Sequence, residues 1–259
     1  MMKKTEIDKL SDKLVKAFLK NKIIAPLPLK YTKKIKNAQK FRKLCESKVN
    51  KQVIGFKAAG TAFAVMKKLK EKEPFYASVY KQNLLKSGKG VKINKSTLGI
   101  ELEVCYIIKK NFFDVKGKLS SKNISKFISY MAPCIEIVGY RQRKKGITSF
   151  GDLCSDFGAN IKFLIGKKTK FKKINIGNLN TYVKNNKNKE ITNGNTSAVY
   201  INPLNSLIFV LKKIKRDKIN LNKNFYIFTG STVGIVPFTN KGTYIGKIEK
   251  LGSVKTTVY

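Results

Sequence analysis

The feature that most constrains this chain is a pair of glutamates inside an apolar, β-branched segment. Residues 97–108 read Thr-Leu-Gly-Ile-Glu-Leu-Glu-Val-Cys-Tyr-Ile-Ile, which is typical of a buried strand except at Glu101 and Glu103. Side chains alternate across a strand, so the two carboxylates point to the same face. A buried ionised carboxylate without a partner is costly, and two neighbours also repel each other. We therefore expect the fold to bring a positive charge to this face.

A third glutamate, Glu136, lies in a second apolar segment, residues 132–141, although only 15 of the 259 residues are acidic. A lysine from elsewhere in the chain could neutralise such groups, and for one isolated buried glutamate that would be the default interpretation. Three strand carboxylates favour a single hard divalent cation instead. Because the chain contains no histidine, carboxylate ligation favours Mg²⁺ or Mn²⁺ over zinc.

The composition predicts one folded protein of enzyme size. Hydrophobic residues make up 42% of the chain and aromatic residues 10%, which is too much for a disordered polypeptide. No apolar run reaches membrane-spanning length, and the N-terminus lacks a signal-peptide core, so we expect a cytoplasmic protein without membrane association. The four cysteines show no paired zinc-type spacing, and we expect them to be reduced core thiols. They are Cys45, Cys105, Cys134 and Cys154.

The formal net charge of +40 suggests nucleic-acid binding, because clustered basic residues displace counterions from phosphates. However, the excess is almost entirely lysine spread along the chain, whereas base and phosphate recognition favours arginine. We therefore expect no specific nucleic-acid partner, and a positive field that helps anionic substrates to arrive. A basic, non-enzymatic nucleic-acid-binding protein is the alternative from another class.

The chain divides into an N-terminal helical layer, residues 1–50, and a larger domain, residues 51–259. Apolar spacings of three and four predict helices over 5–22 and about 33–47. The larger part alternates short strands and turns with one or two helices, which predicts a mostly antiparallel α+β domain instead of a doubly wound sheet.

Within the larger part we predict a hairpin-like turn at 86–92 and a helix over 121–131. Asn202 as N-cap and Pro203 at the first position predict a helix to about residue 215. The last strand is expected over 246–259.

Several further polar residues lie in unusual places. Lys57 ends an apolar strand beside small residues, whereas most lysines must simply cover the surface. Asp152 and Asp156 lie four residues apart in a glycine-containing stretch, where capping of a turn is the commoner role for either aspartate. The small-residue loop after residue 228 could present backbone N–H groups to an anion.

In this order, the motifs resemble those of the fumarylacetoacetate hydrolase superfamily, and within it the branch of 2-keto-4-pentenoate hydratases and 2-oxo-3-hexenedioate decarboxylases. The similarity extends from about residue 50 to 259. The matching elements are Gly55-Phe56-Lys57, Glu101-Leu102-Glu103, Glu136-Ile137-Val138-Gly139-Tyr140-Arg141, Asp156, Pro203-Leu204 and Thr229-Gly230.

The resemblance implies a mixed, mostly antiparallel β-roll that assembles into homo-oligomers and acts on a small 2-oxo acid. It implies that the three glutamates bind Mg²⁺ or Mn²⁺, with Lys57 and Asp156 as catalytic residues. It also implies that Arg141, Thr229 and Gly230 bind the substrate. A nearby dication would lower the pKa of Lys57 toward working pH.

Three departures from the family pattern concern the reaction. Phe75 occupies the place of an aspartate in the hydratases, Phe157 follows Asp156 where asparagine is usual, and Ile201 replaces a glycine. Hydration of a 2-hydroxy-2,4-dienoate, in catabolism of aromatic-derived compounds, is the first interpretation. Metal-assisted decarboxylation of a vinylogous 2-oxo diacid is the second. Hydrolysis by a His-Glu dyad is excluded, because the chain has no histidine.

Overall fold

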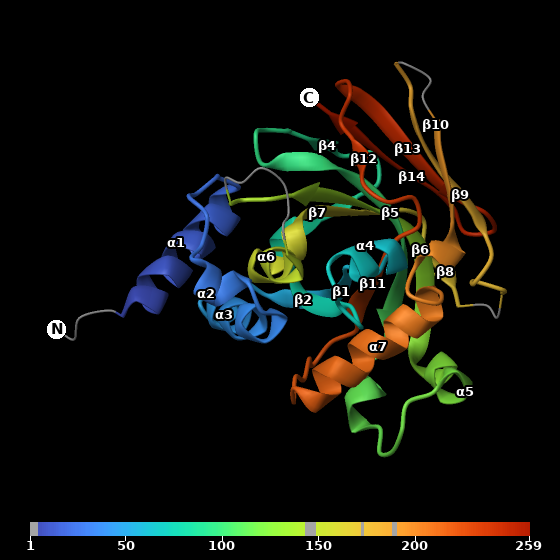
Figure 1. Ribbon diagram of the computed structural model, residues 1–259. Helices are drawn as coiled ribbons and strands as arrows, with labels where there is room; N and C mark the ends of the chain where they lie inside the picture. The colour runs from blue at the N-terminus through green and yellow to red at the C-terminus, as the bar shows by residue number, and fades with distance from the viewer. Residues whose placement is uncertain (1–4, 143–148, 172–173, 188–190) are drawn as a thin grey trace.

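The structure is a computed structural model that describes residues 5–142, 149–171, 174–187 and 191–259. Its strands form two sheets (Figure 1). The larger sheet has the order β2 (Phe75–Tyr80), β1 (Val53–Ala59), β11 (Phe225–Ser231), β5 (Thr97–Ile108), β6 (Ile128–Gly139), β7 (Asn160–Ile165) and β3 (Leu84–Lys86), with β12 (Val236–Pro237) paired to β5 and β8 (Thr169–Lys170) paired to β6. The smaller sheet has the order β10 (Ile191–Asn195), β9 (Asn180–Asn185), β13 (Gly242–Ile248), β14 (Gly252–Val258) and β4 (Gly90–Val91).

Antiparallel pairing dominates both sheets, as predicted for the α+β class. Among the described strands, parallel pairs occur between β1 and β11, β3 and β7, and β14 and β4. The helices are α1 (Glu6–Lys20), α2 (Leu29–Thr32), α3 (Ile35–Ser47), α4 (Phe63–Lys68), α5 (Ser121–Ile124), α6 (Phe150–Ser155) and α7 (Pro203–Arg216). None of the described helices is long and apolar enough to cross a membrane.

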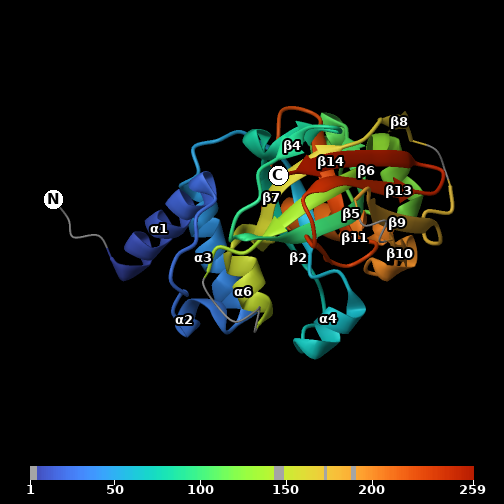
Figure 2. The same ribbon diagram turned by 90° about the horizontal axis from the view of Figure 1, so that it is seen from above.

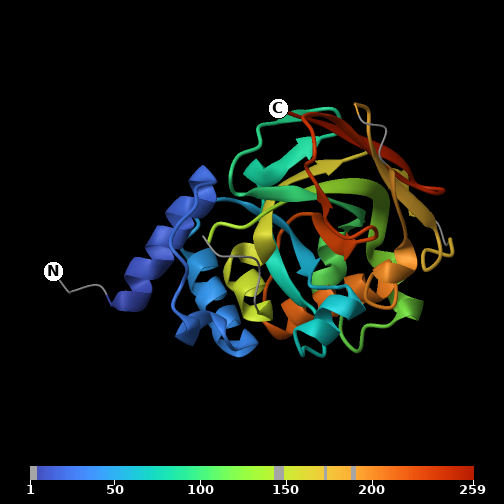
Figure 3. The ribbon, with the colours of Figure 1, turned by 45° about the horizontal axis from the view of Figure 1, so that its top comes forward.

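The larger sheet is strongly curled, and this curl brings distant strands together (Figure 3). Lys57 on β1 and Glu136 on β6 are separated by β11 and β5 in the strand order. In a flat sheet, three strand spacings would put their backbones about 14 Å apart. Nevertheless Lys57 Nζ lies 2.5 Å from Glu136 Oε1. The inner face of the curl is therefore a place where side chains from non-adjacent strands converge.

Helices α1 to α3 lie beside the sheets at the N-terminal end of the chain (Figures 1 and 2). Helix α1 begins where Thr5 Oγ1 accepts a hydrogen bond from the Asp8 N–H, and it ends at Asn21, whose φ is 48°. Apolar side chains of α1 and α3 pack in one cluster with Tyr80 and Phe157. The three helices are thus attached to the sheet region by a continuous apolar contact.

Helix α7 follows the signals in its sequence. Asn202 accepts a hydrogen bond from the Asn205 N–H at 2.9 Å, and Pro203 occupies the first position. The helix packs against β11 and β1. The thiols of all four cysteines are free and buried, as expected.

The sequence prediction was wrong about the segment 121–131. Helix α5 ends at Ile124, a short 3₁₀ turn follows, and β6 already begins at Ile128. Ile128 pairs with Ile108 of β5, and Met131 pairs with Tyr106. Pairing with a long buried neighbour strand therefore overrides the helical spacing of the apolar residues.

One predicted turn and one predicted strand were also wrong. The chain between β3 and β4 does not close a hairpin, because β3 pairs with β7 and β4 pairs with β14, so this turn links the two sheets. The predicted last strand, 246–259, is part of a hairpin of β13 and β14. Gly252, with φ of 103°, begins the second strand in a conformation that favours glycine.

Candidate metal centre

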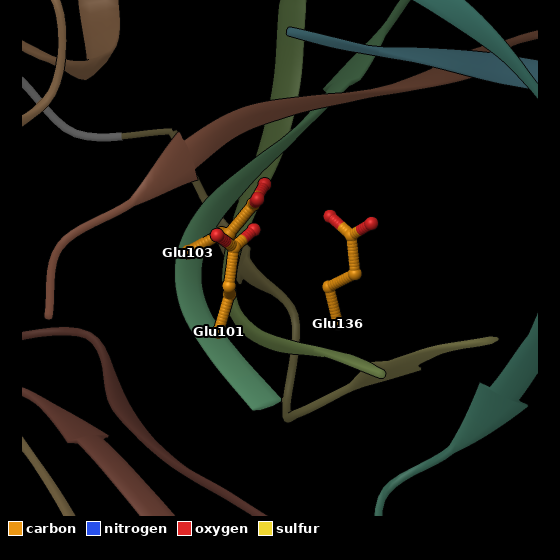
Figure 4. A group of neighbouring side chains, drawn as sticks. All are labelled: Glu101, Glu103 and Glu136. Atoms are coloured by element: carbon orange, nitrogen blue, oxygen red, sulfur yellow. The ribbon is translucent and has the colours of Figure 1, made fainter. Parts of the chain in front are cut away.

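Three carboxylates converge on the inner face of the curled sheet (Figure 4). Glu101 of β5 pairs in register with Glu136 of β6, and Glu103 follows on the same face of β5 because side chains alternate. One carboxylate oxygen from each residue lies within 4.8 Å of the others. Glu103 and Glu136 are fully buried, whereas Glu101 is partly exposed.

The hydrogen bonds of Glu103 and Glu136 each use one of the two carboxylate oxygens. Glu103 Oε2 accepts a hydrogen bond from the Gly230 N–H at 3.0 Å, and Glu136 Oε1 accepts one from Lys57 Nζ. Glu103 Oε1 and Glu136 Oε2 are buried and have no hydrogen-bond partner among the described residues. Buried polar atoms are nearly always satisfied, and carboxylate oxygens are the ligands that hard divalent cations prefer. The donor set therefore fits a divalent cation.

Burial has a large effect on the acidity of this cluster. It raises the pKa of Glu101 and Glu103 to about 7, against a smaller opposing attraction from Lys57. It also raises the pKa of Glu136. Among the described residues, Lys57 is the cation bonded to this cluster, and the three carboxyl groups keep their protons to a higher pH than ordinary carboxyl groups do.

Lys57 is 2% exposed and makes two hydrogen bonds, to Glu136 Oε1 at 2.5 Å and to the Gly158 carbonyl oxygen at 3.1 Å. Burial is the largest single influence and lowers the pKa of Lys57, but the attraction of Glu136, Glu101 and Glu103 outweighs it and raises that pKa above its ordinary value. This differs from the lowered pKa expected beside a dication. Among the carboxylates alone, Lys57 is a protonated hydrogen-bond donor.

A cavity of about 320 Å³ adjoins the cluster at Glu101, which is the carboxylate of the three that lines it. Its charged lining residues are Lys57, Glu101 and, at the end of α4, Lys68. Thr61 and Ser231 contribute hydroxyl groups, and much of the remaining wall is apolar. The larger apolar lining residues are Val65, Leu69, Val138, Leu153 and Ile235. The cavity can thus receive a small molecule whose polar end reaches the carboxylates.

Known proteins share this architecture. No family model and no curated protein matches the sequence. Among solved structures, 4-oxalocrotonate decarboxylase from Pseudomonas putida G7, complexed with magnesium and adipate, is similar with a TM-score of 0.83 at 17% identity, over 100% of this chain and 99% of that one. Fumarylpyruvate hydrolase from Pseudomonas aeruginosa, in complex with Mn²⁺ and pyruvate, gives 0.60 at 11% identity, over 79% and 88%.

A fumarylacetoacetate hydrolase family protein from Yersinia pestis CO92 gives a TM-score of 0.54 at 14% identity, over 82% of this chain and 95% of that one. The chain has the fold of the fumarylacetoacetate hydrolase superfamily. The match to the decarboxylase extends over the whole chain, so the N-terminal helices also have a counterpart in that structure. The resemblance read from the sequence began only near residue 50.

Two residues that the superfamily resemblance implied as substrate ligands lie at the end of β11. Gly230 lines the cavity with φ of 103°, and its N–H is already bonded to Glu103. A Cβ atom at this glycine would lie 2.1 Å from Thr61 Oγ1, so the close approach requires glycine. Thr229 is fully buried, and its hydroxyl donates to the Val104 carbonyl oxygen at 2.8 Å. Its side chain therefore joins β11 to β5.

The structure places Arg141 and Asp156 together but not at the cavity. The Arg141 backbone N–H and its Nη1 donate to the two oxygens of Asp156, at 2.5 and 3.0 Å, and its Nη2 donates to the Asn160 carbonyl oxygen. Both side chains are about 1% exposed or less. Neither residue is among those lining the cavity around Glu101. Lys57 Nζ donates to the Gly158 carbonyl oxygen, two residues beyond Asp156.

Sequence reasoning missed Gly158, Thr61 and Lys68 as parts of this site. Gly158 contributes only a backbone carbonyl, which carries no residue-type signal apart from the glycine itself. Lys68 is one lysine in a sequence full of them. Only the curl of the sheet and the position of α4 bring these groups to one cavity.

Proposed function

We propose that the protein is a divalent-metal-dependent lyase that decarboxylates an unsaturated 2-oxo diacid. The single observation that carries this proposal is the cluster of three carboxylates, with two unpartnered buried oxygens, beside a cavity that also holds Lys57. The similarity in fold to metal-complexed structures of 4-oxalocrotonate decarboxylase and fumarylpyruvate hydrolase supports it.

Glu101, Glu103 and Glu136 would hold Mg²⁺ or Mn²⁺ through their carboxylate oxygens. The bound cation would polarise the 2-oxo group and neutralise charge that develops on its oxygen. The Gly230 N–H fixes Glu103, and Lys57 fixes Glu136, so two ligands are oriented before any ion arrives.

Lys57 is proposed as the proton donor. Its amine lies between Glu136 and the Gly158 carbonyl at the cavity wall, where it can hydrogen-bond to a substrate oxygen. In a vinylogous 2-oxo diacid, the bond to the distal carboxylate breaks and carbon dioxide leaves. The electron pair moves through the double bond onto the 2-oxo oxygen, and the proton from Lys57 completes the product.

The charged groups of the cavity favour decarboxylation over hydration. Addition of water requires a group that activates or delivers water to the distal double bond. Of the described residues that line the cavity, the one carboxylate is Glu101, which belongs to the metal site. Decarboxylation needs no separate base, and Lys68 gives a positive charge that could receive the second carboxylate.

Hydration of a 2-hydroxy-2,4-dienoate is the second candidate. The observation that favours it is the apolar wall formed by residues such as Val65, Leu69 and Ile235, which suits an uncharged substrate tail. Both reactions use the same metal and the same Lys57.

The test is to incubate the purified protein with unsaturated 2-oxo diacids and with 2-hydroxy-2,4-dienoates, with Mg²⁺ or with EDTA. Release of carbon dioxide from a diacid, dependent on Mg²⁺, supports decarboxylation. Incorporation of ¹⁸O from labelled water into a dienoate, without release of carbon dioxide, supports hydration instead. Glu103→Gln should remove either activity, and Glu73→Gln, on the surface, is the matched control. No metal-dependent reaction with either class would contradict the proposal.

A further inference from the structure

An unusual turn holds Lys57 from outside its own strand. Phe157, Gly158 and Ala159 have φ angles of 52°, 68° and 59°, all in the left-handed region that residues other than glycine, asparagine and aspartate rarely adopt. The turn directs the Gly158 carbonyl oxygen at Lys57 Nζ, 3.1 Å away. One of the two hydrogen bonds of the lysine therefore depends on a backbone conformation that Phe157 and Ala159 disfavour by themselves.

Packing from the N-terminal helices compensates for this local preference. The ring of Phe18, on α1, stacks on the ring of Phe157 with centroids 4.1 Å apart and planes at 23°. The guanidinium carbon of Arg141 lies 4.8 Å from the centroid of the Phe18 ring. Phe18 is 4% exposed and Phe157 is fully buried. Helix α1 therefore fixes the Phe157 side chain, and with it the first residue of the turn.

The turn also packs directly against the lysine. A Cβ atom added at Gly158 would lie 3.2 Å from Ala77 Cβ and 3.6 Å from Lys57 Cδ. Because so little space separates the turn from the stem of the lysine, a shift of the turn must move the lysine as well.

We propose that Phe18 is a positioning residue for Lys57, acting through the ring of Phe157 and the carbonyl of Gly158. The inference rests on the proposed role of Lys57 as proton donor. Without the Phe18 ring, Phe157 relaxes toward a commoner backbone conformation, and the Gly158 carbonyl turns away from the amine. The N-terminal layer thus sets the direction of a catalytic side chain that it does not touch.

Phe18→Leu removes the stack and keeps an apolar side chain, and Phe41→Leu is its matched control. Phe41 is 1% exposed, belongs to the same apolar cluster, and stacks on Tyr31 with centroids 5.4 Å apart. We expect both variants to lose similar stability. Only Phe18→Leu should lower kcat, by about tenfold or more, with KM and Mg²⁺ affinity within about twofold of wild type.

A second readout requires no substrate. Lys57 is 2% exposed, so an amine-acetylating reagent should modify it slowly, and mass spectrometry can follow this one residue. Phe18→Leu should accelerate acetylation of Lys57 by about tenfold or more, as expected for a local opening, whereas Phe41→Leu should not. If wild type turns over none of the acids tested, the proposed function fails, but the labelling comparison still decides this inference.

Phe157→Asn provides the rescue, because asparagine adopts the left-handed conformation more readily than phenylalanine. In that background, Phe18→Leu should no longer change kcat or the acetylation of Lys57. The inference is overturned if Phe18→Leu and Phe41→Leu have equal effects on both readouts. It is also overturned if the effect of Phe18→Leu persists unchanged in the Phe157→Asn protein.

Discussion

Two of the buried groups of charged side chains in the described part of the chain differ in balance. In the first, Lys57 bonds to one of three strand carboxylates, two carboxylate oxygens have no partner in the described part of the chain, and a cavity lies beside Glu101. In the second, Arg141 and Asp156 pair one to one beneath α1, away from that cavity. Burial of charge alone therefore does not mark a functional site, and we base the proposed metal site on the unused carboxylate oxygens and the cavity beside Glu101.

The two clusters also differ in what their removal should do. Loss of one partner of a balanced buried ion pair destabilises the fold, because the other charge is left buried and unpaired. In the unbalanced cluster, loss of one carboxylate relieves repulsion and removes a ligand. Loss of one partner of the Arg141–Asp156 pair should reduce stability, and loss of one carboxylate of the cluster should reduce activity.

The largest effect is expected from the ligands. Glu101→Gln, Glu103→Gln and Glu136→Gln should each abolish metal-dependent turnover while the protein stays folded, because each removes one anionic ligand and one source of repulsion. Turnover in Mg²⁺ and the denaturant midpoint in EDTA provide the measurement. If any of the three keeps wild-type turnover, that residue is not a ligand.

The next effect is expected from Lys57. Lys57→Met should lower turnover by about two to four orders of magnitude, the usual contribution of one acid–base group, while metal binding persists. Lys67→Met is the surface control, because Lys67 is exposed and lies next to Lys68 in the sequence without lining the cavity. Near-wild-type turnover of Lys57→Met would make this lysine structural.

The balanced pair should show the opposite pattern. Arg141→Met should destabilise the protein by about 3–5 kcal/mol, because Asp156 is left buried without its partner. Arg216→Met, which removes an exposed ion pair with Asp217, should cost about 1 kcal/mol or less. Urea unfolding in EDTA compares the two. A small loss for Arg141→Met, together with a raised KM, would return this arginine to the substrate site.

The smallest effect concerns pH. In EDTA, Glu101 and Glu103 have pKa values near 7 in the folded protein, above the ordinary carboxyl value of 4.5. Between these values the folded state holds protons that the unfolded state has released, so the contribution of the cluster to stability falls as pH rises from 4.5 to about 7. The Glu101→Gln/Glu103→Gln protein should lose less stability over this range. Identical pH profiles would mean that these carboxyls titrate normally.

The sequence revealed the chemistry of the site better than its geometry. Strand alternation was enough to place Glu101 and Glu103 on one face, and residue type was enough to favour a hard cation. The contact between Lys57 and Glu136 depends on the curl of a sheet across intervening strands. No local pattern contains that curl. Likewise, nothing near Arg141 in the sequence indicates that this arginine forms a buried ion pair with Asp156.

The fold shows the same limit. Helix α7 was predicted because its start signals are local, with Asn202 as N-cap and Pro203 in the first turn. The start of β6 at Ile128 was missed, because its pairing partner Ile108 lies in another strand. Local sequence signals therefore predict a helix where a capping residue marks its start. The start of a strand such as β6 depends instead on pairing with a strand that is distant in the sequence.

The most direct test of the central claim is titration of the EDTA-treated protein with Mn²⁺ by calorimetry, with thermal unfolding in parallel. We expect one ion per chain and a rise in Tm, since ligand at 100 times Kd stabilises a folded protein by about 2.7 kcal/mol. Glu103→Gln should lose both signals, and Glu73→Gln should keep them. Absence of Mn²⁺ binding and of any Tm shift in the wild-type protein would contradict the metal site and, with it, the proposed function.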